Sequence, residues 1–304
     1  MQHAGPMLII ANPTSGKGRG RRTSERVRDL LIRAGLSAEL RFTTATGDAE
    51  RFAGEACTDG SSRACIIACG GDGTVQEVAN ALARSRARAP DSTPIMGLAP
   101  AGRCNDFGRD LGIGRNPEAI ARTLLSGKPR PLDLGRINGR YFCTVATAGI
   151  DAAVSRYVDK LRWLRGTPAY VLGAFAVLSR YRAPRLRITG DFGVIEQSVF
   201  LASSANTSSY GGAIAIAPDA VPDDGLLDLC VIDAVSRLRA LELIPYVLLG
   251  RHRNRREVHF YRSRRILIES LDPMELWADG EPVGQAPADI ELIPAAIQIM
   301  LPVT

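Results

Sequence analysis

The chain has 304 residues, of which 45% are hydrophobic, so it is long enough for two ordinary domains and apolar enough to give each a core. It carries 38 Lys and Arg against 32 Asp and Glu, a net charge of +6 that favours anionic partners such as nucleotides, nucleic acid or an anionic membrane surface. The charge does not choose among these partners, and the composition is that of a soluble globular protein.

Cysteine spacing and hydropathy argue against a zinc site, a disulfide framework and a membrane span. The longest uncharged stretch, Gly166–Ser179, is shorter than the ~18–20 apolar residues that a bilayer span requires. The cysteines form no CxxC pair and the histidines form no metal cluster. Because no secretory signal precedes the first predicted strand, we expect buried free thiols in a reducing cytosol. The residues concerned are Cys57, Cys65, Cys69, Cys104, Cys143, Cys230, His3, His252 and His259.

Strands and helices alternate through the first part of the chain. The run Ala64–Cys69 is continuously apolar and closed by glycines, which is typical of a strand buried on both faces of a parallel sheet. This alternation predicts a doubly wound α/β domain over residues 1–130. In chain order we predict strand Met7–Ala11, a helix from Ser24 that ends at Gly35, strand Ala38–Phe42, helix Asp48–Cys57, strand Ala64–Cys69, helix Thr74–Ala83 and strand Pro94–Ala99.

After Pro129-Arg130-Pro131 the pattern becomes β-rich. Short apolar runs between Gly, Pro, Asp and Asn turns are typical of a sandwich or layered sheet. Residues 131–304 are therefore expected to form a second domain with helices at one edge, whose last residues are free to return toward the first domain. We predict strands at Leu132–Ile137, Arg140–Ala146, Leu186–Ile188, Val194–Ala202, Leu226–Ile232, Arg265–Ser270 and Ala296–Leu301, with helices at about Ser155–Tyr181 and Ser236–Leu249.

The turn Gly70-Gly71-Asp72-Gly73-Thr74 joins a predicted buried strand to a predicted helix. Glycines let backbone N–H groups approach an anion closely, and a helix N-terminus adds a favourable dipole. Asp72 repels phosphate unless a metal ion or a donor intervenes. A tight strand-to-helix turn with Thr74 near the N-cap would explain the same residues, but we favour nucleotide binding.

Two further loops follow predicted strands. Asn12-Pro13-Thr14-Ser15-Gly16-Lys17 is not a Walker P-loop, because Ala11 stands at the first glycine and Gly18 at the Mg²⁺-binding hydroxyl. Pro100–Phe107 follows the Pro94–Ala99 strand, where Asn105 or Asp106 could simply cap a helix. Each loop alone is an ordinary turn. Three such loops at strand ends predict one crevice, at the sheet edge where open α/β sheets bind ligands.

Taken together, the motifs resemble the diacylglycerol kinase catalytic-domain family, which also contains sphingosine and ceramide kinases and bacterial lipid kinases and shares an NAD-kinase-like fold. The resemblance spans nearly the whole chain in the family's order. It is carried by Asn12–Gly16, Gly70–Thr74 with Glu77-Val78-Ala79-Asn80, Asn105-Asp106-Phe107, Gly149-Ile150-Asp151, Tyr210-Gly211-Gly212, Ala217–Ala220, Asp223–Asp228 and Asp279-Gly280-Glu281.

This resemblance implies that ATP binds between an α/β domain and a β-rich lipid-binding domain and phosphorylates a lipid hydroxyl of a diacylglycerol-like lipid, ceramide or a sphingoid base. It also implies Mg²⁺ as a cofactor, with Asp72 and Asp106 at the catalytic ion. Phosphoryl transfer depends mostly on positioning and charge neutralisation, which suits such parts. The positions matching nucleotide ligands are Asn12, Pro13, Thr14, Ser15, Gly16, Thr43, Gly70, Gly71, Asp72, Gly73, Thr74 and Asn105.

In the second domain the resemblance implies a general base at Glu281, with Asp279 beside it. It also implies a second, structural Mg²⁺ held by the carbonyls of Val221 and Leu226 and the carboxylate of Asp224. Asp279-Gly280 is a strong hairpin signal, and a hairpin alone would explain it. Arg103 departs from the family pattern, because it replaces a small hydroxyl residue thought to contact the nucleotide. We predict that it contacts the ATP phosphates and that Arg103→Thr alters the KM for ATP.

Two segments are candidates for contact with lipid. Ser155–Tyr181 is too apolar for a solvated helix, so it forms either a wall for acyl chains or a helix packed on the β-domain core. Seven arginines between Arg251 and Arg265, with Phe260 and Tyr261 among them, could dock on anionic headgroups. A solvated basic face or a nucleic-acid contact would explain them too, but no nucleic-acid motif accompanies them. We therefore predict a cytoplasmic enzyme bound peripherally to membranes.

Two other functions remain open at this point. A soluble kinase of the NAD-kinase type shares the Gly-Gly-Asp-Gly turn, but the motifs Asn105–Phe107 and Asp223–Asp228 argue against it. A catalytically silent nucleotide-binding membrane protein is disfavoured by the presence of Glu281, Asp72 and Asp106. Edge strands in the β-rich half leave a homodimer open as well.

Overall fold

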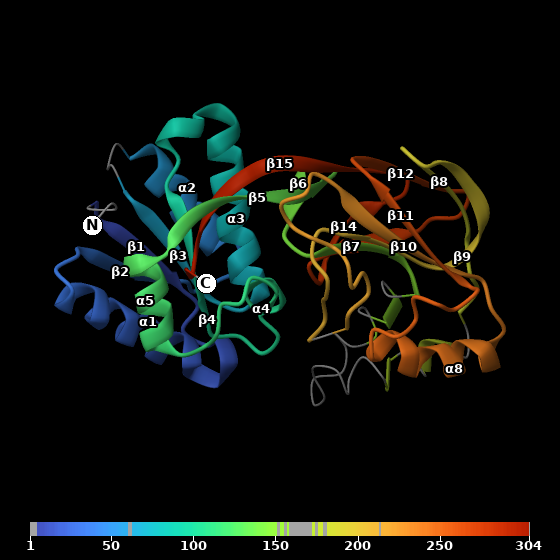
Figure 1. Cartoon of the computed structure of the whole chain (residues 1–304), viewed down its shortest axis with the longest axis horizontal. Helices are drawn as coiled ribbons and strands as arrows, with labels where there is room; N and C mark the ends of the chain where they lie inside the picture. Colours follow the sequence, from blue (N-terminus) through green and yellow to red (C-terminus); the bar gives the residue numbers. More distant parts are fainter. Residues whose placement is uncertain are drawn as a thin grey trace. The chain divides into compact units, whose positions relative to one another are not determined.

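The computed structural model describes residues 5–59, 63–150, 153–154, 157, 172–173, 176–178, 181–212 and 214–303. It divides the chain into two compact units, one formed by Met1–Asp133 with Pro294–Thr304 and the other by Leu134–Ile293. The chain leaves the first unit along β5 (Lys128–Ile137) and returns to it along β15 (Ala288–Leu301), as Figure 1 shows.

The first unit is a parallel sheet covered by helices on both faces. Its strands lie in the order β4-β3-β1-β2, and the end of β15 adds to β4 through the parallel pair Ile299 and Met96. Helices α1 and α5 pack together, and so do α2 and α3 (Figure 1). The elements are β1 (Met7–Ala11), α1 (Ser15–Arg33), β2 (Ala38–Phe42), α2 (Asp48–Thr58), β3 (Cys65–Gly70), α3 (Asp72–Arg88), a 3-10 turn (Pro90–Ser92), β4 (Ile95–Pro100), α4 (Asp106–Asp110) and α5 (Pro117–Ser126).

The four strands predicted for this unit are confirmed, and the fully buried β1 and β3 agree with a sheet covered on both faces. The helix predicted from Ser24 is wrong at its start, since α1 already begins at Ser15 and is interrupted only at Gly16–Gly18. Its first turns carry arginines and no apolar period, so the pattern hid them. The helix predicted from Thr74 also begins earlier, at Asp72.

The second unit is a sandwich of two mainly antiparallel sheets. One sheet has the order β14-β13-β7-β9-β10-β11, and the other contains β8, β12 and β15 together with β5 and β6. The long strand β9 belongs to both, because its first half pairs with β8 and its second half with β7 and β10. The elements are β6 (Arg140–Phe142), β7 (Val145–Gly149), β8 (Arg185–Gly190), β9 (Gly193–Ala205), β10 (Leu227–Asp233), α8 (Arg237–Leu248), β11 (Val258–Ser263), β12 (Arg265–Ser270), β13 (Glu275–Ala278) and β14 (Glu281–Gln285).

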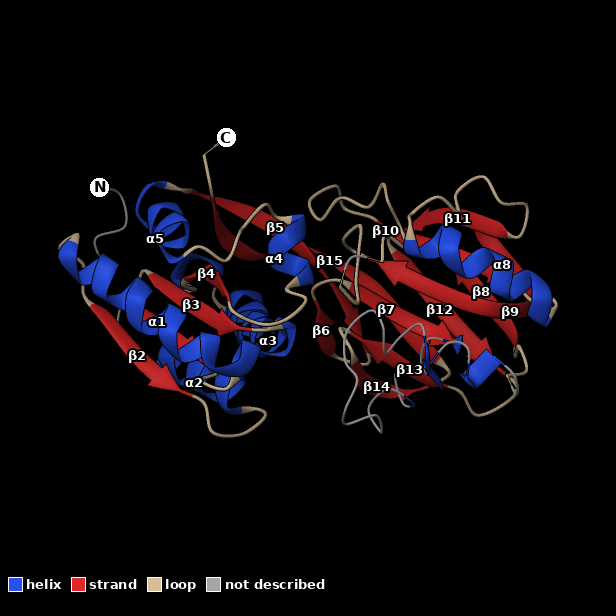
Figure 2. Ribbon diagram, turned by 90° about the horizontal axis from the view of Figure 1, so that it is seen from below, coloured by secondary structure: helices blue, strands red, loops and turns tan. Residues whose placement is uncertain are grey.

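Two hydrophobic cores hold the second unit together. Val199, Leu229 and Ile266 lie in the core between the two sheets. On the other face of the sheet that contains β7, β9, β10 and β11, Leu201 and Cys230 pack against Leu243 of α8, the helix seen beside β11 in Figure 2. Burying each such side chain contributes about 1.5–3 kcal/mol, so the sheet is anchored on both faces. The predicted β-rich sandwich and the predicted helix Ser236–Leu249 are confirmed.

Some predictions for the second unit are corrected. The strand expected over Arg140–Ala146 is interrupted at Cys143 and Thr144, whose amides bind a distant carboxylate (described below). Strands β11, β13 and β14 were not predicted, because β13 is only four residues long, β14 contains Pro and Gly, and polar residues interrupt β11. Most of the predicted helix Ser155–Tyr181, with Asp151, lies outside the described residues. The cysteines are free thiols as expected, although Cys57 and Cys104 are only half-buried.

Candidate active site

Four loops of the first unit meet at the carboxyl ends of its parallel strands. The Asn12 amide donates to the Cys69 carbonyl at 2.9 Å, and the Thr43 amide donates to the Ala11 carbonyl at 2.9 Å. The Ala101 amide donates to the Gly70 carbonyl at 2.8 Å. The structure therefore brings together the loops after β1, β2, β3 and β4 at one edge of the sheet, and the ligand-binding crevice there stays a prediction.

Several glycines in these loops are needed by the protein's own packing. A Cβ on Gly16 would lie 2.1 Å from the Ala101 carbonyl oxygen, and one on Gly102 would lie 2.4 Å from the Gly71 Cα. A Cβ on Gly70 would lie 2.4 Å from the Thr74 hydroxyl oxygen. Gly73 differs, because a Cβ there would meet nothing within 4 Å, and its φ lies outside the left-handed region. The fold itself therefore gives no reason for glycine at position 73.

Asp72 is bonded to the loop after β4. Its two carboxylate oxygens accept the amides of Asn105 at 2.8 Å and Asp106 at 2.7 Å. The Asn105 side chain in turn accepts the Gly102 amide at 2.8 Å and donates to the Gly102 carbonyl, so its amide group shapes the loop. Asp106 is buried and paired with Arg109. The Asp72 and Asp106 positions are thus adjacent, but both carboxylates are already bonded, so a Mg²⁺ ion held by them and by substrate phosphates stays a prediction.

The remaining nucleotide residues predicted in this unit lie on the same loops. The Asn12 side chain accepts the Thr14 amide at 3.1 Å and the Thr14 hydroxyl at 2.9 Å. Thr43 is buried, whereas Arg103 is exposed on the loop after β4. The contact of Arg103 with ATP stays a prediction.

In the second unit, Asp279 sits in the hairpin turn between β13 and β14. Asp279 has φ +50° and Gly280 has φ +84°, which is the geometry of a type I′ turn. The Asp279 carboxylate accepts the amides of Cys143 at 2.6 Å and Thr144 at 2.8 Å, and the Thr144 hydroxyl at 2.6 Å. Burial raises the pKa of Asp279, and these donors oppose that shift. Asp279 therefore ties the hairpin to the break between β6 and β7.

Glu281 follows two residues later as the first residue of β14. It is exposed, unlike the partly buried Asp279. An exposed carboxylate at the end of a rigid hairpin can take up a proton from a hydroxyl group without disrupting the fold.

The carboxylate predicted to hold a second Mg²⁺ is already bonded. Asp224 pairs with the Arg262 guanidinium, and its other oxygen accepts the Leu226 amide at 3.1 Å. Arg262 lies directly opposite Asp228 across the β10–β11 pair, and its Nε is 3.5 Å from Asp228 Oδ1. A guanidinium between two carboxylates supplies the positive charge that a metal ion would supply. A Mg²⁺ ion held by Asp224 and the carbonyls of Val221 and Leu226 would have to compete with Arg262, and this site stays a prediction.

An apolar cavity lies in the second unit between α8 and the sheet that contains β7, β9, β10 and β11. The cavity is partly open to solvent, and its lining is almost wholly hydrophobic. Phe200 and Leu201 of β9 contribute to it, together with Leu243 and Val247 of α8. We left open whether the apolar segment Ser155–Tyr181 forms an acyl-chain wall or packs on the β-domain core, and Leu178 is its lining residue that the structure describes.

Four of the seven arginines in the basic run from Arg251 to Arg265 pair with carboxylates. Besides Arg262, three of its arginines pair with carboxylates, and the Arg255 guanidinium lies 3.7 Å from the ring centre of Tyr246. Part of the run is the strand β11. The docking of this segment on anionic headgroups stays a prediction. The pairs are Arg253 with Asp219, Arg256 with Glu257, and Arg265 with Asp289.

Comparison with known proteins decides the family. Residues 6–137 match the model of the diacylglycerol kinase catalytic domain, and residues 144–301 match that of the YegS C-terminal NAD kinase beta sandwich-like domain. A diacylglycerol kinase of Bacillus subtilis is 32% identical over 97% of this chain and 95% of its own length. The chain belongs to the diacylglycerol kinase family.

Other relatives agree with this placement. A diacylglycerol kinase of Mycobacterium tuberculosis is 32% identical over 98% of this chain and 96% of its own length. A solved structure described as a putative diacylglycerol kinase from Bacillus anthracis has a TM-score of 0.84 at 26% identity, and covers 99% of this chain and 96% of that one. As a member of this family the chain is a kinase, built from an α/β catalytic domain and a C-terminal sandwich.

Sequence reasoning missed two features of this diacylglycerol kinase family member. Glu77 belongs to a quoted motif, but no role was assigned to it, although its carboxylate binds two backbone amides 28 and 30 residues away. Helix α8 was predicted as a helix without any link to lipid, although it lines the apolar cavity. The apolar run Leu243–Leu248 in the second half of α8 was the available signal, since a solvated helix would carry a polar face along its whole length.

Proposed function

We propose that the protein is an ATP-dependent lipid kinase that transfers the γ-phosphoryl group of ATP to the hydroxyl of a diacylglycerol-like lipid. The nucleotide-binding part of this proposal rests on the glycine at position 73. Neither packing nor backbone conformation requires glycine there, whereas a phosphate bound against the turn would. The relatives named diacylglycerol kinase support the lipid half.

The loops of the first unit would hold the nucleotide. Backbone N–H groups of Gly71–Thr74, at the N-terminus of α3, would face the phosphates, and the loops after β1, β2 and β4 would surround them. Mg²⁺ would be held by Asp72 and Asp106 and would neutralise charge on the phosphates.

Glu281 would act as the general base. Its carboxylate would take the proton of the lipid hydroxyl as the hydroxyl oxygen forms a bond to the γ-phosphorus. The bond from that phosphorus to the β–γ bridging oxygen breaks, and ADP leaves with the electron pair. Asp279 would position the hairpin that carries Glu281, because its carboxylate already accepts donors from Cys143 and Thr144.

The apolar cavity of the second unit would receive an acyl chain, since its lining has almost no polar surface. The described residues include no helix that is both long and apolar enough to span a bilayer. We propose that the protein meets a membrane from its surface through α8. Leu238 and Leu249 at the ends of this helix are 76% and 68% exposed, and Leu243 and Val247 between them line the cavity.

The acceptor can be identified with γ-labelled ATP, Mg²⁺ and a panel of dioleoylglycerol, ceramide, sphingosine and NAD. We expect label in the lipid extract, and mostly from dioleoylglycerol. Label in NAD alone would replace the proposal with a soluble NAD-kinase-type activity. Binding of ATP without transfer to any acceptor would indicate a silent nucleotide-binding protein.

A further inference from the structure

The loop between β2 and α2 needs a partner from elsewhere in the fold. It runs from Thr43 to Gly47, and Gly47 is the N-cap of α2 with φ +87°. Glycine has no side chain to accept the free amides of a first helical turn, which ordinarily bind Ser, Thr, Asp or Asn at that position. The first turn of α2 is therefore capped by a residue outside its own segment.

Glu77 of α3 provides that cap. Its Oε1 accepts the Gly47 amide at 2.9 Å, and its Oε2 accepts the Ala49 amide at 3.0 Å. Both bonds are charge-assisted, and a carboxylate at a helix N-terminus also interacts favourably with the helix dipole. One side chain thus fixes both backbone donors at the junction of the loop and α2.

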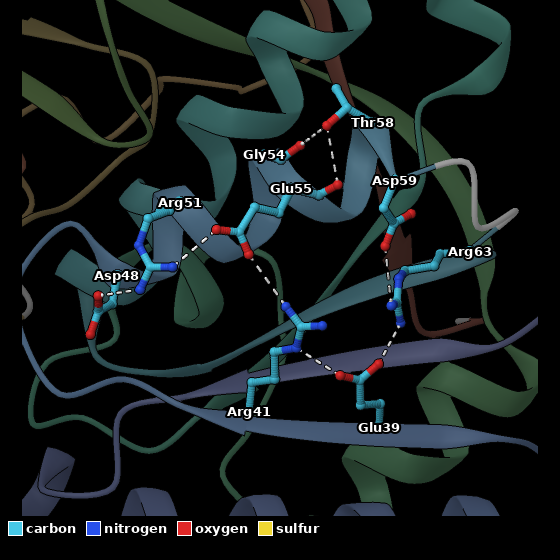
Figure 3. A network of polar contacts seen from close by, with 9 residues as sticks. All are labelled: Glu39, Arg41, Asp48, Arg51, Gly54, Glu55, Thr58, Asp59 and Arg63. Carbon is cyan, nitrogen blue, oxygen red and sulfur yellow. Dashed lines mark hydrogen bonds and ion pairs between the residues drawn. The ribbon is translucent and has the colours of Figure 1, made fainter.

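The rest of the loop is tied down as well. The Thr43 amide is bonded to Ala11 of β1, as described above. The Asp48 carboxylate accepts the amides of Thr44 at 2.8 Å and Ala45 at 3.0 Å. Asp48 also pairs with Arg51 at 2.8 Å, at one end of the ion-pair network shown in Figure 3. The Glu77 carboxylate joins this ordered loop to α3, the helix that follows the glycine turn.

Helix α3 therefore carries two carboxylates that act in the same way. Asp72, at its start, holds the loop after β4, and Glu77 holds the loop after β2. The glycine turn lies at the N-terminus of this helix. The helix thereby sets the positions of the loops that flank the turn in space.

We propose that Glu77 is a positioning residue that sets the affinity for nucleotide by fixing the Thr43–Gly47 backbone, without contacting the reacting atoms. The proposal rests on the nucleotide site proposed above. It predicts an effect on nucleotide binding that exceeds any effect on turnover, because the groups assigned to the chemistry remain in place.

Glu77→Ala and Glu77→Gln test this inference, with Glu50→Gln as the matched control. Glu50 of α2 pairs with Arg84 of α3, so the control removes an ion pair between the same two helices without touching the loop amides. We expect Glu77→Ala to weaken binding of ATP, measured by calorimetry without lipid, about tenfold, and kcat at saturating ATP to stay within about twofold. Glu77→Gln keeps one acceptor oxygen, so we expect an intermediate loss. Amide exchange at Gly47 and Ala49 should accelerate in Glu77→Ala alone.

Unchanged ATP affinity in a folded Glu77→Ala protein would overturn the inference. So would a loss of affinity of the same size in Glu50→Gln, since the effect would then come from general loosening of α2 and α3. If the wild-type protein itself bound no ATP, the proposed nucleotide site would fail, and this inference with it. Those results are distinguishable, because the wild-type titration is read separately from the variants.

Discussion

Each of the two units contains an aspartate that lies in a motif predicted to take part in catalysis. In the structure, each of these aspartates accepts hydrogen bonds from backbone amides. Asp72 follows the glycine turn and holds the loop after β4, while Asp279 lies in a hairpin and holds the break between β6 and β7. Around Asp72, the residue that orders the loop is also the one that we propose to meet a metal ion beside Asp106. Around Asp279, the two roles are divided, because the exposed Glu281 lies two residues away. A carboxylate in a motif is therefore not by itself evidence of catalysis, and its existing hydrogen bonds decide its role.

The largest effect should come from Glu281→Gln, which removes the proposed base and leaves the hairpin intact. We expect kcat for lipid phosphorylation to fall about 10²–10⁴-fold, with ATP affinity and melting temperature close to those of the wild type. Steady-state kinetics and a thermal melt measure these quantities. Activity within a few-fold of wild type would remove Glu281 from the mechanism.

Gly73→Ala should have the next largest effect. The added methyl group meets no protein atom within 4 Å, so the fold should tolerate it, whereas a phosphate at the turn would be displaced. We expect ATP affinity to fall about tenfold or more without loss of stability. Gly54→Ala on α2 is the matched control, because a Cβ there also meets nothing within 4 Å. Equal ATP affinity in the two variants would contradict a phosphate site at the turn.

Asp279→Asn should mainly lower the free energy of unfolding. The asparagine would present an NH₂ group to backbone donors that now bind a carboxylate oxygen, and an unsatisfied buried donor costs about 1–3 kcal/mol. Chemical denaturation should show a loss of that size, larger than for Glu281→Gln. If Asp279→Asn abolished turnover at full stability, Asp279 rather than Glu281 would be the chemical group.

The smallest effect should be that of Mg²⁺ on the second unit. Because Arg262 supplies the positive charge beside Asp224 and Asp228, Mg²⁺ or EDTA without nucleotide should shift the melting temperature of the wild type by less than about 1 °C. A clear Mg²⁺-dependent rise that disappears in Asp224→Asn would show that a metal site is present there.

Much of the architecture could be predicted because it is written in local patterns. The apolar run Ala64–Cys69 predicted the buried parallel strand β3, and parallel strands place their loops at one edge of the sheet. The hairpin at Asp279-Gly280 followed from its turn residues. What could not be predicted depends on contacts between distant segments. The Glu77 carboxylate binds amides that lie 30 and 28 residues earlier in the sequence. The Asp279 carboxylate binds amides at the break in a strand more than a hundred residues earlier.

The most direct test of the central claim is transfer of label from γ-labelled ATP to dioleoylglycerol in mixed micelles by the purified protein. The account predicts labelled phosphatidic acid with the wild-type protein and with Gly54→Ala, and almost none with Glu281→Gln. Absence of labelled lipid from the wild-type reaction, or equal labelling by Glu281→Gln, would contradict it.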